Sequence, residues 1–175
     1  MTPKKRGGLC GRMKQLCSGL FALGIAFHAA SALAEEKPFS AGVFDPVQIV
    51  PSSEGIKGAR LSLFYGYNTT LKGFDFVFLG VNRVKSDMTG AQLGLVNWTE
   101  SGQQAGAQLG LVSLTGGSFH GAQLGWAFNY AKEVNGLQFG VVNYAERLNG
   151  LQLGLVNIAK NGFLPVFVIF NFHFD

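Results

Sequence analysis

Apolar and polar residues alternate with a period of two through the second half of the chain. In the segment from Ala91 to Leu95, the odd positions are apolar and the even positions hold Gln and Gly, and 151–155 repeats this pattern. Strict alternation predicts β-strands with one apolar face and one polar or small face. A helix is disfavoured, because two glycines in each unit would cost about 1 kcal/mol apiece.

The alternation belongs to an internal repeat, Gly-x-Gln-Leu-Gly-Leu-Val-Asn, and such a repeat constrains architecture more than any other sequence feature. Short turn-like segments separate the copies, and Asn-Gly pairs at 135–136, 149–150 and 161–162 favour turns. Between Lys72 and Lys160 nearly every charge lies in such a segment. The copies begin at Gly58, Gly73, Gly90, Gly106, Gly121, Gly136 and Gly150, so the spacing drifts between 14 and 17 residues.

The third position of each copy is always polar. Burying these side chains without partners would cost several kcal/mol each, so we expect them to face water, a hydrated interior or their own ladder of hydrogen bonds. Two positions later most copies have Gly, which predicts crowding on a curved inner face. The first two polar residues either form an ion pair or are independently hydrated. This polar column comprises Arg60, Asp75, Gln92, Gln108, Gln123, Gln138 and Gln152.

The opposite face is apolar from strand to strand and exceeds what a soluble monomer usually exposes, so it points into a core or into lipid. At the C-terminus, Phe170, Phe172 and Phe174 share one face of a strand, which resembles the last strand of bacterial outer-membrane barrels. Seven copies and this strand give eight strands, the smallest such barrel. We therefore predict an all-β fold, an antiparallel meander closing into an outer-membrane-type barrel of about eight strands.

A β-solenoid of stacked repeats is the alternative fold. One copy would form one coil, Gln and Asn would stack into ladders, a recurring Asn would suit a corner, and leucines would fill the interior. The drifting spacing and the lack of a capping role for the aromatic terminal strand favour the barrel.

Residues 1–34 have the order of a secretory signal peptide, with a basic start, an apolar run and the small-x-small site Ala32-Leu33-Ala34. An N-terminal membrane anchor is the alternative. Without this segment 9 basic and 10 acidic residues remain and both cysteines are gone. The net charge of +4 thus gives no support for nucleic-acid binding, and disulfides are excluded. We divide the rest into an N-terminal lead segment, 35–57, in which Pro46 favours an edge strand or no strand, and a repeat-built β domain, 58–175.

The repeats and the C-terminal segment together resemble a family of bacterial surface-repeat proteins with tandem Gly-Leu-Gln-Ile-Gly-Leu-Val-Asn units and a Pro-x-Phe-x-x-Phe-Asn-Phe-x-Phe ending. The matching residues are the five copies from Gly90 to Asn157, the ending from Pro165 to Phe174, and 58–66 as the entry strand. The chain departs from the pattern at Ser113 and in the copy at 121–129, where the Asn comes one place late. The resemblance implies architecture and cellular placement, and no activity.

These patterns predict a non-enzymatic structural protein of the Gram-negative cell envelope, exported to the outer membrane or cell surface, with the periplasm as the alternative location. We expect the lipid bilayer as partner, no nucleic acid and no cofactor, while small-molecule ligands and protein partners stay open. A surface binding or adhesion module, using Trp98 or Trp126, is the first alternative. A small lipid-modifying enzyme is the second, resting on Ser118 and His120, which share a face if extended but have no acidic neighbour in sequence. Two histidines and no cysteine in the exported part give no metal-ligand spacing.

Overall fold

A computed structural model describes residues 36–174, and 35–175 form one compact unit. The expected signal peptide lies outside the described residues. The described part is all-β, and no helix in it is long and apolar enough to cross a membrane. Its strands are β1 (Lys37–Phe44), β2 (Val47–Gln48), β3 (Ile56–Ser62), β4 (Tyr65–Asn68), β5 (Leu71–Val77), β6 (Val81–Val84), β7 (Met88–Leu93), β8 (Val96–Thr99), β9 (Gln103–Phe139), β10 (Val142–Ala159) and β11 (Val166–His173).

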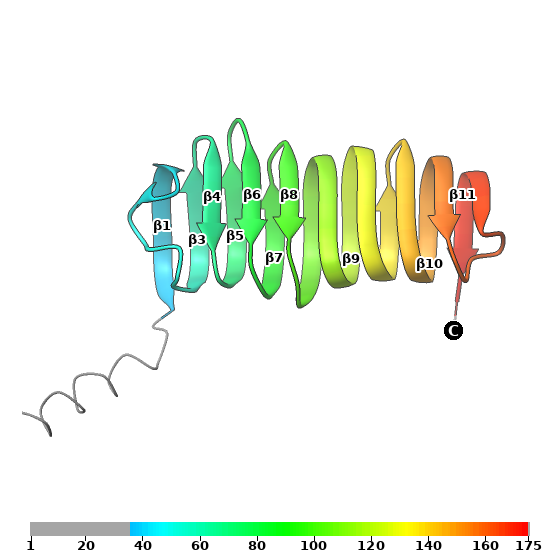
Figure 1. Cartoon of the computed structure of the whole chain (residues 1–175), viewed down its shortest axis with the longest axis horizontal. Helices are drawn as coiled ribbons and strands as arrows, with labels where there is room; N and C mark the ends of the chain where they lie inside the picture. Colours follow the sequence, from blue (N-terminus) through cyan, green and yellow to red (C-terminus); the bar gives the residue numbers. More distant parts are fainter. Residues whose placement is uncertain (1–35, 175) are drawn as a thin grey trace, which may run out of the picture. The chain divides into compact units, whose positions relative to one another are not determined.

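Successive copies of the repeat stack as parallel coils, so this unit is a β-solenoid (Figure 1). β3, β5, β7 and the first part of β9 pair in parallel along one side of the coils, and β4, β6 and β8 do so along the other. The long strands β9 and β10 continue the stack through several turns and also pair in parallel. The prediction of an antiparallel barrel is therefore wrong, and the solenoid alternative describes the topology.

The physical reason lies in the polar column. In an antiparallel meander with one strand per copy, successive strands reverse, so equivalent residues would alternate between the two ends of the sheet. Parallel coils hold equivalent residues at one height, as in the registers of Gly73 with Gly90 and of Gln92 with Gln108. Each copy of about 15 residues accordingly forms two short strands and two turns, where we had expected one strand.

The drift in repeat spacing does not break the stacking, because the turns absorb it. Asn82 follows Gly73 by nine positions, whereas Asn97 follows Gly90 by seven. The strands on either side still pair glycine with glycine and asparagine with asparagine. The same allowance explains why Asn129 comes one place late and still pairs with Asn143.

The two ends of the stack also differ from expectation. β1 lies in the predicted lead segment but pairs in parallel with β3, so this segment contributes to the solenoid. Pro46 lies in the turn between β1 and the short edge strand β2, which is the second of the two alternatives given for it, no strand. At the other end the aromatic strand β11 runs antiparallel to β10, from Gly150 opposite His173 to Ile158 opposite Val166. It therefore covers the last coil, a role that we had not foreseen for it.

The solenoid has a polar interior and an apolar exterior. Among the described residues 20 polar or charged residues are buried, against 12 hydrophobic ones, and 27 large hydrophobic residues are exposed. The leucines that were expected to fill a solenoid interior lie outside it. Buried apolar side chains form two small clusters. One comprises Val50, Ile56, Leu71, Val84 and Met88, and the other Phe119, Ala131, Val134, Ala145, Leu148 and Ala159.

Candidate functional site: an apolar surface over a polar interior

The glutamines of the polar column form one continuous ladder inside the solenoid. Each side-chain amide donates from Nε2 to Oε1 of the glutamine in the preceding coil, at 2.9 Å from Gln108 to Gln92 and 2.7 Å from Gln138 to Gln123. Gln123 and Gln152 donate in the same direction, at 2.9 and 2.7 Å. All are fully buried. The ladder gives each buried amide a partner, which removes most of the desolvation penalty.

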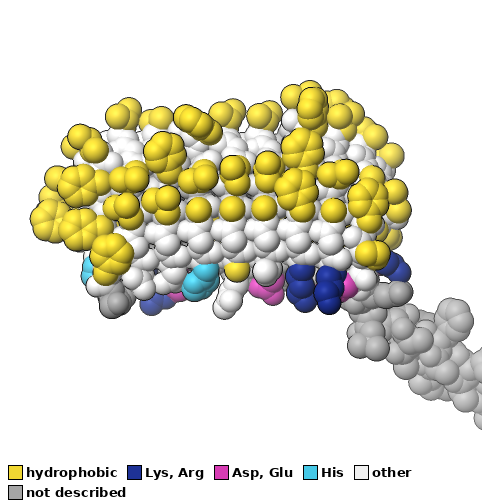
Figure 2. All heavy atoms as spheres, turned by 180° about the vertical axis from the view of Figure 1, so that it is seen from behind, with side chains coloured by type: hydrophobic (Ala, Val, Ile, Leu, Met, Phe, Trp, Pro, Cys, Tyr) yellow, Lys and Arg dark blue, Asp and Glu magenta, His cyan; other side chains and the backbone are white. Residues whose placement is uncertain are grey.

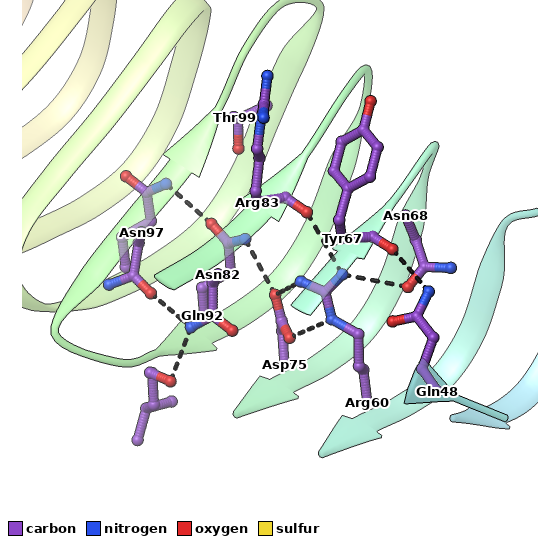
Figure 3. A network of polar contacts seen from close by, with 12 residues as sticks. Gln48, Arg60, Tyr67, Asn68, Asp75, Asn82, Arg83, Gln92, Asn97 and Thr99 are labelled. Carbon is purple, nitrogen blue, oxygen red and sulfur yellow. Dashed lines mark hydrogen bonds and ion pairs between the residues drawn. The ribbon is translucent and has the colours of Figure 1, made fainter. Parts of the chain in front are cut away.

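The N-terminal end of this ladder is charged. Gln92 donates to Oδ2 of Asp75 at 3.1 Å, and Arg60 donates to the same carboxylate from Nε at 2.7 Å and from Nη2 at 2.6 Å (Figure 3). Arg60 also donates from Nη1 to the side chain of Asn68 and to the backbone carbonyl of Arg83. Both charged side chains are fully buried. The structure thus shows the ion pair that the sequence left open.

The recurring asparagine forms a second ladder beside the turns. Asn129 donates to Asn143, and Asn143 to Asn157, both at 2.8 Å. The same Nδ2 atoms donate to backbone carbonyls of the next coil, for example from Asn143 to Leu153 at 2.9 Å. The second glycine column makes this possible, because a Cβ on Gly154 would lie 2.6 Å from Nδ2 of Asn143. The same Cβ would lie 1.9 Å from the carbonyl oxygen of Gly140, so the predicted crowding comes from the backbone of the preceding coil together with the asparagine amides.

The first glycine column is required by backbone geometry. Gly106 has a φ of 123°, which side chains other than glycine rarely adopt. A Cβ at this position would lie 2.0 Å from the carbonyl oxygen of Gly90 in the preceding coil. The repeat therefore begins with glycine because the coils approach each other closely there.

Apolar side chains are exposed on the outer faces of the coils and along one row of turns. Figure 2 shows this row together with one of the faces. We call this row the apolar tip; it comprises the turns at 63–64, 78–80, 94–95, 110–111, 125–127, 140–141 and 154–155. Its most exposed side chains are Trp126 at 68 % and Leu155 at 67 %. Trp126, Phe139, Val141, Leu155 and Ile169 line an open groove of about 400 Å³ at the C-terminal part of the tip. The tip is a large apolar surface of the kind that marks an interaction site.

Charged residues gather on the opposite row of turns (Figure 2). We call this row the charged edge; it carries Lys57, Lys72, Lys85, Asp87, Glu100, Lys132, Glu133, Glu146, Arg147 and Lys160. Neighbouring coils pair their charges there, as in Lys72 with Glu36 at 2.8 Å and Lys160 with Glu146 at 3.5 Å, and Arg147 pairs with Glu133. Residues 36–174 contain 9 basic and 8 acidic residues. The ten residues of the edge are six basic and four acidic, so both signs are present with a small positive excess.

We call the side of the coils that contains β3, β5 and β7 the first face and the side that contains β4, β6 and β8 the second face. On the second face, one row of aromatic side chains lies between the charged edge and the apolar residues. We call it the aromatic row; it comprises Tyr67, Trp98, Tyr130 and Tyr144. Tyr130 and Tyr144 stack with ring centroids 5.4 Å apart. The guanidinium of Arg83 lies between the other two, 5.1 Å from the ring of Tyr67 and 4.7 Å from that of Trp98. Hydrogen bonds to Tyr65 and then to Glu100 raise the pKa of Arg83, which keeps it charged.

The residues behind the enzyme hypothesis lie on the outer surface near the charged edge. Ser118 donates from Oγ to Oε2 of Glu133 at 2.9 Å, so a carboxylate that is distant in sequence occupies its hydroxyl. His120 is exposed on the same strand. The hydroxyl of Ser118 is thus bonded to a carboxylate that also pairs with Arg147, whereas the enzyme hypothesis had relied on His120. Over residues 36–174 no group of three or more His, Cys, Asp and Glu is placed to hold a metal ion.

Comparisons with protein families, with curated proteins and with solved structures found no match to this chain. The resemblance to surface-repeat proteins therefore stays a prediction. The functional argument depends on the geometry of the solenoid alone.

Proposed function

We propose that the protein is a non-enzymatic surface-binding module, and that the surface to which it binds is a lipid layer. The single observation that carries this proposal is the polarity of the solenoid, whose exposed apolar tip and faces enclose a hydrogen-bonded polar interior. Export to the outer membrane or cell surface, which the sequence suggests, fits this role and remains part of the proposal.

The apolar exposure provides the driving force. Transferring one Leu or Phe side chain fully from water into an apolar medium contributes about 1.5–3 kcal/mol. The tip and faces carry many such side chains in adjacent coils, among them Leu95, Leu111 and Leu155, which are 42, 50 and 67 % exposed. A few of these residues together supply enough free energy to offset the loss of freedom on binding.

The backbone at the tip is suited to a medium without water. In hydrocarbon every N–H and C=O needs a partner within the protein. The N–H groups of the tip turns donate to neighbouring coils, from Leu111 to Leu95 at 2.9 Å, from Val141 to Trp126 at 2.8 Å and from Gly94 to Leu109 at 3.1 Å. The asparagine ladder occupies carbonyls beside the same turns. The turns therefore bring few unpaired polar groups into lipid.

Equivalent positions in the described repeats carry similar side chains, and this uniformity supports a binding role. The interior residues serve their neighbours in the stack, and the exterior repeats similar side chains from coil to coil. Catalysis depends on a particular constellation of a nucleophile, a base and an orienting group. Ser118 and His120 are the nearest approach to one, and Glu133 takes the hydroxyl of Ser118.

Flotation with phosphatidylcholine vesicles tests the proposal. We expect the folded protein to float with the vesicles. In a triple variant at the tip, L95Q/L111Q/L155Q, we expect the ratio of vesicle-bound to free protein to fall at least tenfold. A triple variant at the charged edge, K85Q/K132Q/K160Q, removes as many side chains from the polar side and is expected to bind like the unaltered protein. Circular dichroism checks that all three proteins are folded.

Two results would overturn the proposal. The first is a folded protein that stays at the bottom of the gradient. The second is a stable dimer or larger assembly, seen by sedimentation without lipid, that does not bind vesicles and that the tip variant dissociates, since the tip would then be an interface between copies of the chain.

A further inference from the structure

We infer that the solenoid enters only one leaflet of a bilayer, with its strands along the membrane normal, the apolar tip deepest and the aromatic row at the headgroup boundary, and that it does so without requiring anionic lipid. This inference rests on the proposed function, namely that the bound surface is lipid. It adds a depth, an orientation and a headgroup class.

The depth follows from the length of the strands. From Thr89, at the charged edge, to Leu93, the last residue of β7, the strand rises about 13 Å over four residue steps. The uncharged turn at 94–95 lies beyond this point and forms the tip. The hydrocarbon core of a bilayer is about 30 Å thick, so one leaflet contributes about 15 Å. The coil is too short to span both leaflets, and its apolar part matches one.

The registers arrange the outer residues in bands of equal depth. On the first face, Lys57 pairs with Lys72 and Lys72 with Thr89, beside the charged edge. The next row toward the tip holds Phe74 and Ala91, and the row after it holds Phe76 and Leu93. Polarity thus falls from the charged edge to the tip in each coil, and the stacking extends this gradient along the solenoid. Such a gradient matches the change from headgroups to hydrocarbon in a leaflet.

The second face carries the same gradient with a different boundary. Its row nearest the charged edge pairs Tyr67 with Arg83 and Arg83 with Trp98, and its next row pairs Tyr65 with Val81. Tyr and Trp are enriched where membrane proteins cross from headgroups to hydrocarbon. The guanidinium of Arg83 is held against these rings and pairs with Glu100 at 2.8 Å, toward the charged edge. The aromatic row therefore marks the level of the interface.

The distribution of charge complements a leaflet of zwitterionic lipid. Both signs occur together at the charged edge, where neighbouring coils pair them. Recognition of anionic lipid generally uses a cluster of 4–8 Lys and Arg, worth about 1 kcal/mol each near the surface. The edge holds six such residues, and three of them, Lys72, Arg147 and Lys160, pair with carboxylates of neighbouring coils. The charged pair at the depth of the leaflet, Arg60 with Asp75, lies inside the solenoid and is fully buried. The tip turns from 63–64 to 154–155 therefore bring no charge into the hydrocarbon, while Asp45, in the turn between β1 and β2, lies at the N-terminal end of this row. At the charged edge basic and acidic residues are interspersed, although Lys57 and Lys72 are neighbours.

The two tryptophans of the chain lie at the two levels that the inference distinguishes. Trp126 is at the tip and Trp98 is in the aromatic row. The variants W98F and W126F each leave one of them as the fluorophore and keep an aromatic ring at the other position. Each protein is bound to phosphatidylcholine vesicles whose acyl chains carry bromine either near the carbonyl end or near the methyl end, since bromine quenches only nearby tryptophan.

We expect the W98F protein, which reports on Trp126, to be quenched at least twofold more by bromine near the methyl end. The W126F protein, which reports on Trp98, should show the reverse preference. Equal quenching of both proteins at one bromine position would overturn the inference, because the solenoid would then lie flat on one face. Failure of the unaltered protein to float with vesicles would instead overturn the proposed function, so the two failures are distinguishable.

Vesicles of mixed headgroup test the remaining part. Replacing a third of the phosphatidylcholine by phosphatidylglycerol should change the apparent affinity less than about threefold, and raising the salt concentration should change it little. A gain in affinity of tenfold or more that added salt abolishes would overturn the assignment of headgroup class. The depth of insertion is tested separately by the bromine quenching.

Discussion

The interior and the exterior of the solenoid reverse the usual arrangement of a soluble protein. Inside, Gln108 is fully buried and bonded to glutamines of both neighbouring coils, while outside, the adjacent Leu109 is 37 % exposed. The difference teaches that alternation along a strand defines two faces but does not say which face is buried. In this fold the buried face is the one whose side chains can hydrogen-bond to the same residues of neighbouring coils.

Stacking favours the polar face as the interior. A glutamine amide has both a donor and an acceptor, so a column of glutamines at one height can pair completely with its own kind. In water such bonds replace bonds to solvent and contribute little, whereas in a dry interior each unmade bond costs about 1–3 kcal/mol. The leucines need no partner. They can lie outside wherever lipid or another apolar surface receives them.

The largest effect is expected where the coils touch. The variant G106A would place a Cβ 2.0 Å from a carbonyl oxygen at a φ of 123°, so the coils must separate. We expect a loss on the order of 4 kcal/mol or more in the free energy of unfolding, measured by denaturant titration. The adjacent outward change A107G is the control, with a loss of about 1 kcal/mol. Equal losses for the two variants would show that the close contact between coils at Gly106 contributes no more to stability than an ordinary position of the strand.

The charged end of the ladder should rank second. D75L leaves Arg60 buried without its carboxylate, and losing one partner of such a pair costs about 3–5 kcal/mol. The double variant R60M/D75L removes both charges and should recover most of this loss, because a buried pair can often be replaced by apolar residues of similar size. Denaturation midpoints of both variants test this. If the double variant were as unstable as the single one, the pair would hold the ladder in register beyond balancing its own charges.

The third prediction compares neighbours on opposite sides of one strand. Q108L leaves Oε1 of Gln92 without its donor, while Gln123 keeps its bonds to Thr115 and to the backbone of Tyr130. We expect a loss of about 1–3 kcal/mol, as for one unsatisfied buried acceptor. L109Q, on the outside, should leave stability within about 0.5 kcal/mol and weaken vesicle binding instead. A greater loss for L109Q than for Q108L would reverse our assignment of inside and outside.

The sequence predicted the polar and apolar faces of the strands correctly, but it did not predict how the strands are connected. Alternation and the invariant polar column correctly indicated an all-β chain, and the placement of that column inside agrees with the buried glutamines. The neighbouring positions of Arg60 and Asp75 in the column suggested the ion pair that the structure shows. These inferences succeeded because they depend on period and chemistry within each copy.

The direction of successive strands could not be derived in this way. Whether one copy forms one strand or two depends on where the chain turns, and Leu93-Gly94-Leu95 contains no residue that is a strong turn signal apart from glycine. The turn there is stabilised from outside the copy, because Asn82 of the preceding coil donates to the carbonyl of Leu93 at 2.8 Å. The solenoid alternative had placed the recurring asparagine at a corner and in a ladder, but its bond to a backbone carbonyl of the next coil is seen only with the coils in place.

The smallest effect should come from the exposed ion pairs, which contrast with the buried pair inside. A hydrogen bond from Lys72 lowers the pKa of Glu36 below its ordinary value of 4.5. A lowered pKa stabilises the folded state above the ordinary pKa, and this contribution is lost as the pH falls through the lowered value. Both groups lie in solvent, where such pairs contribute little. We therefore expect E36Q to leave the denaturation midpoint at neutral pH unchanged. A clear loss, on the scale of D75L, would mean that charges at the edge hold the coils together and are not simply the part of the module that meets water and headgroups.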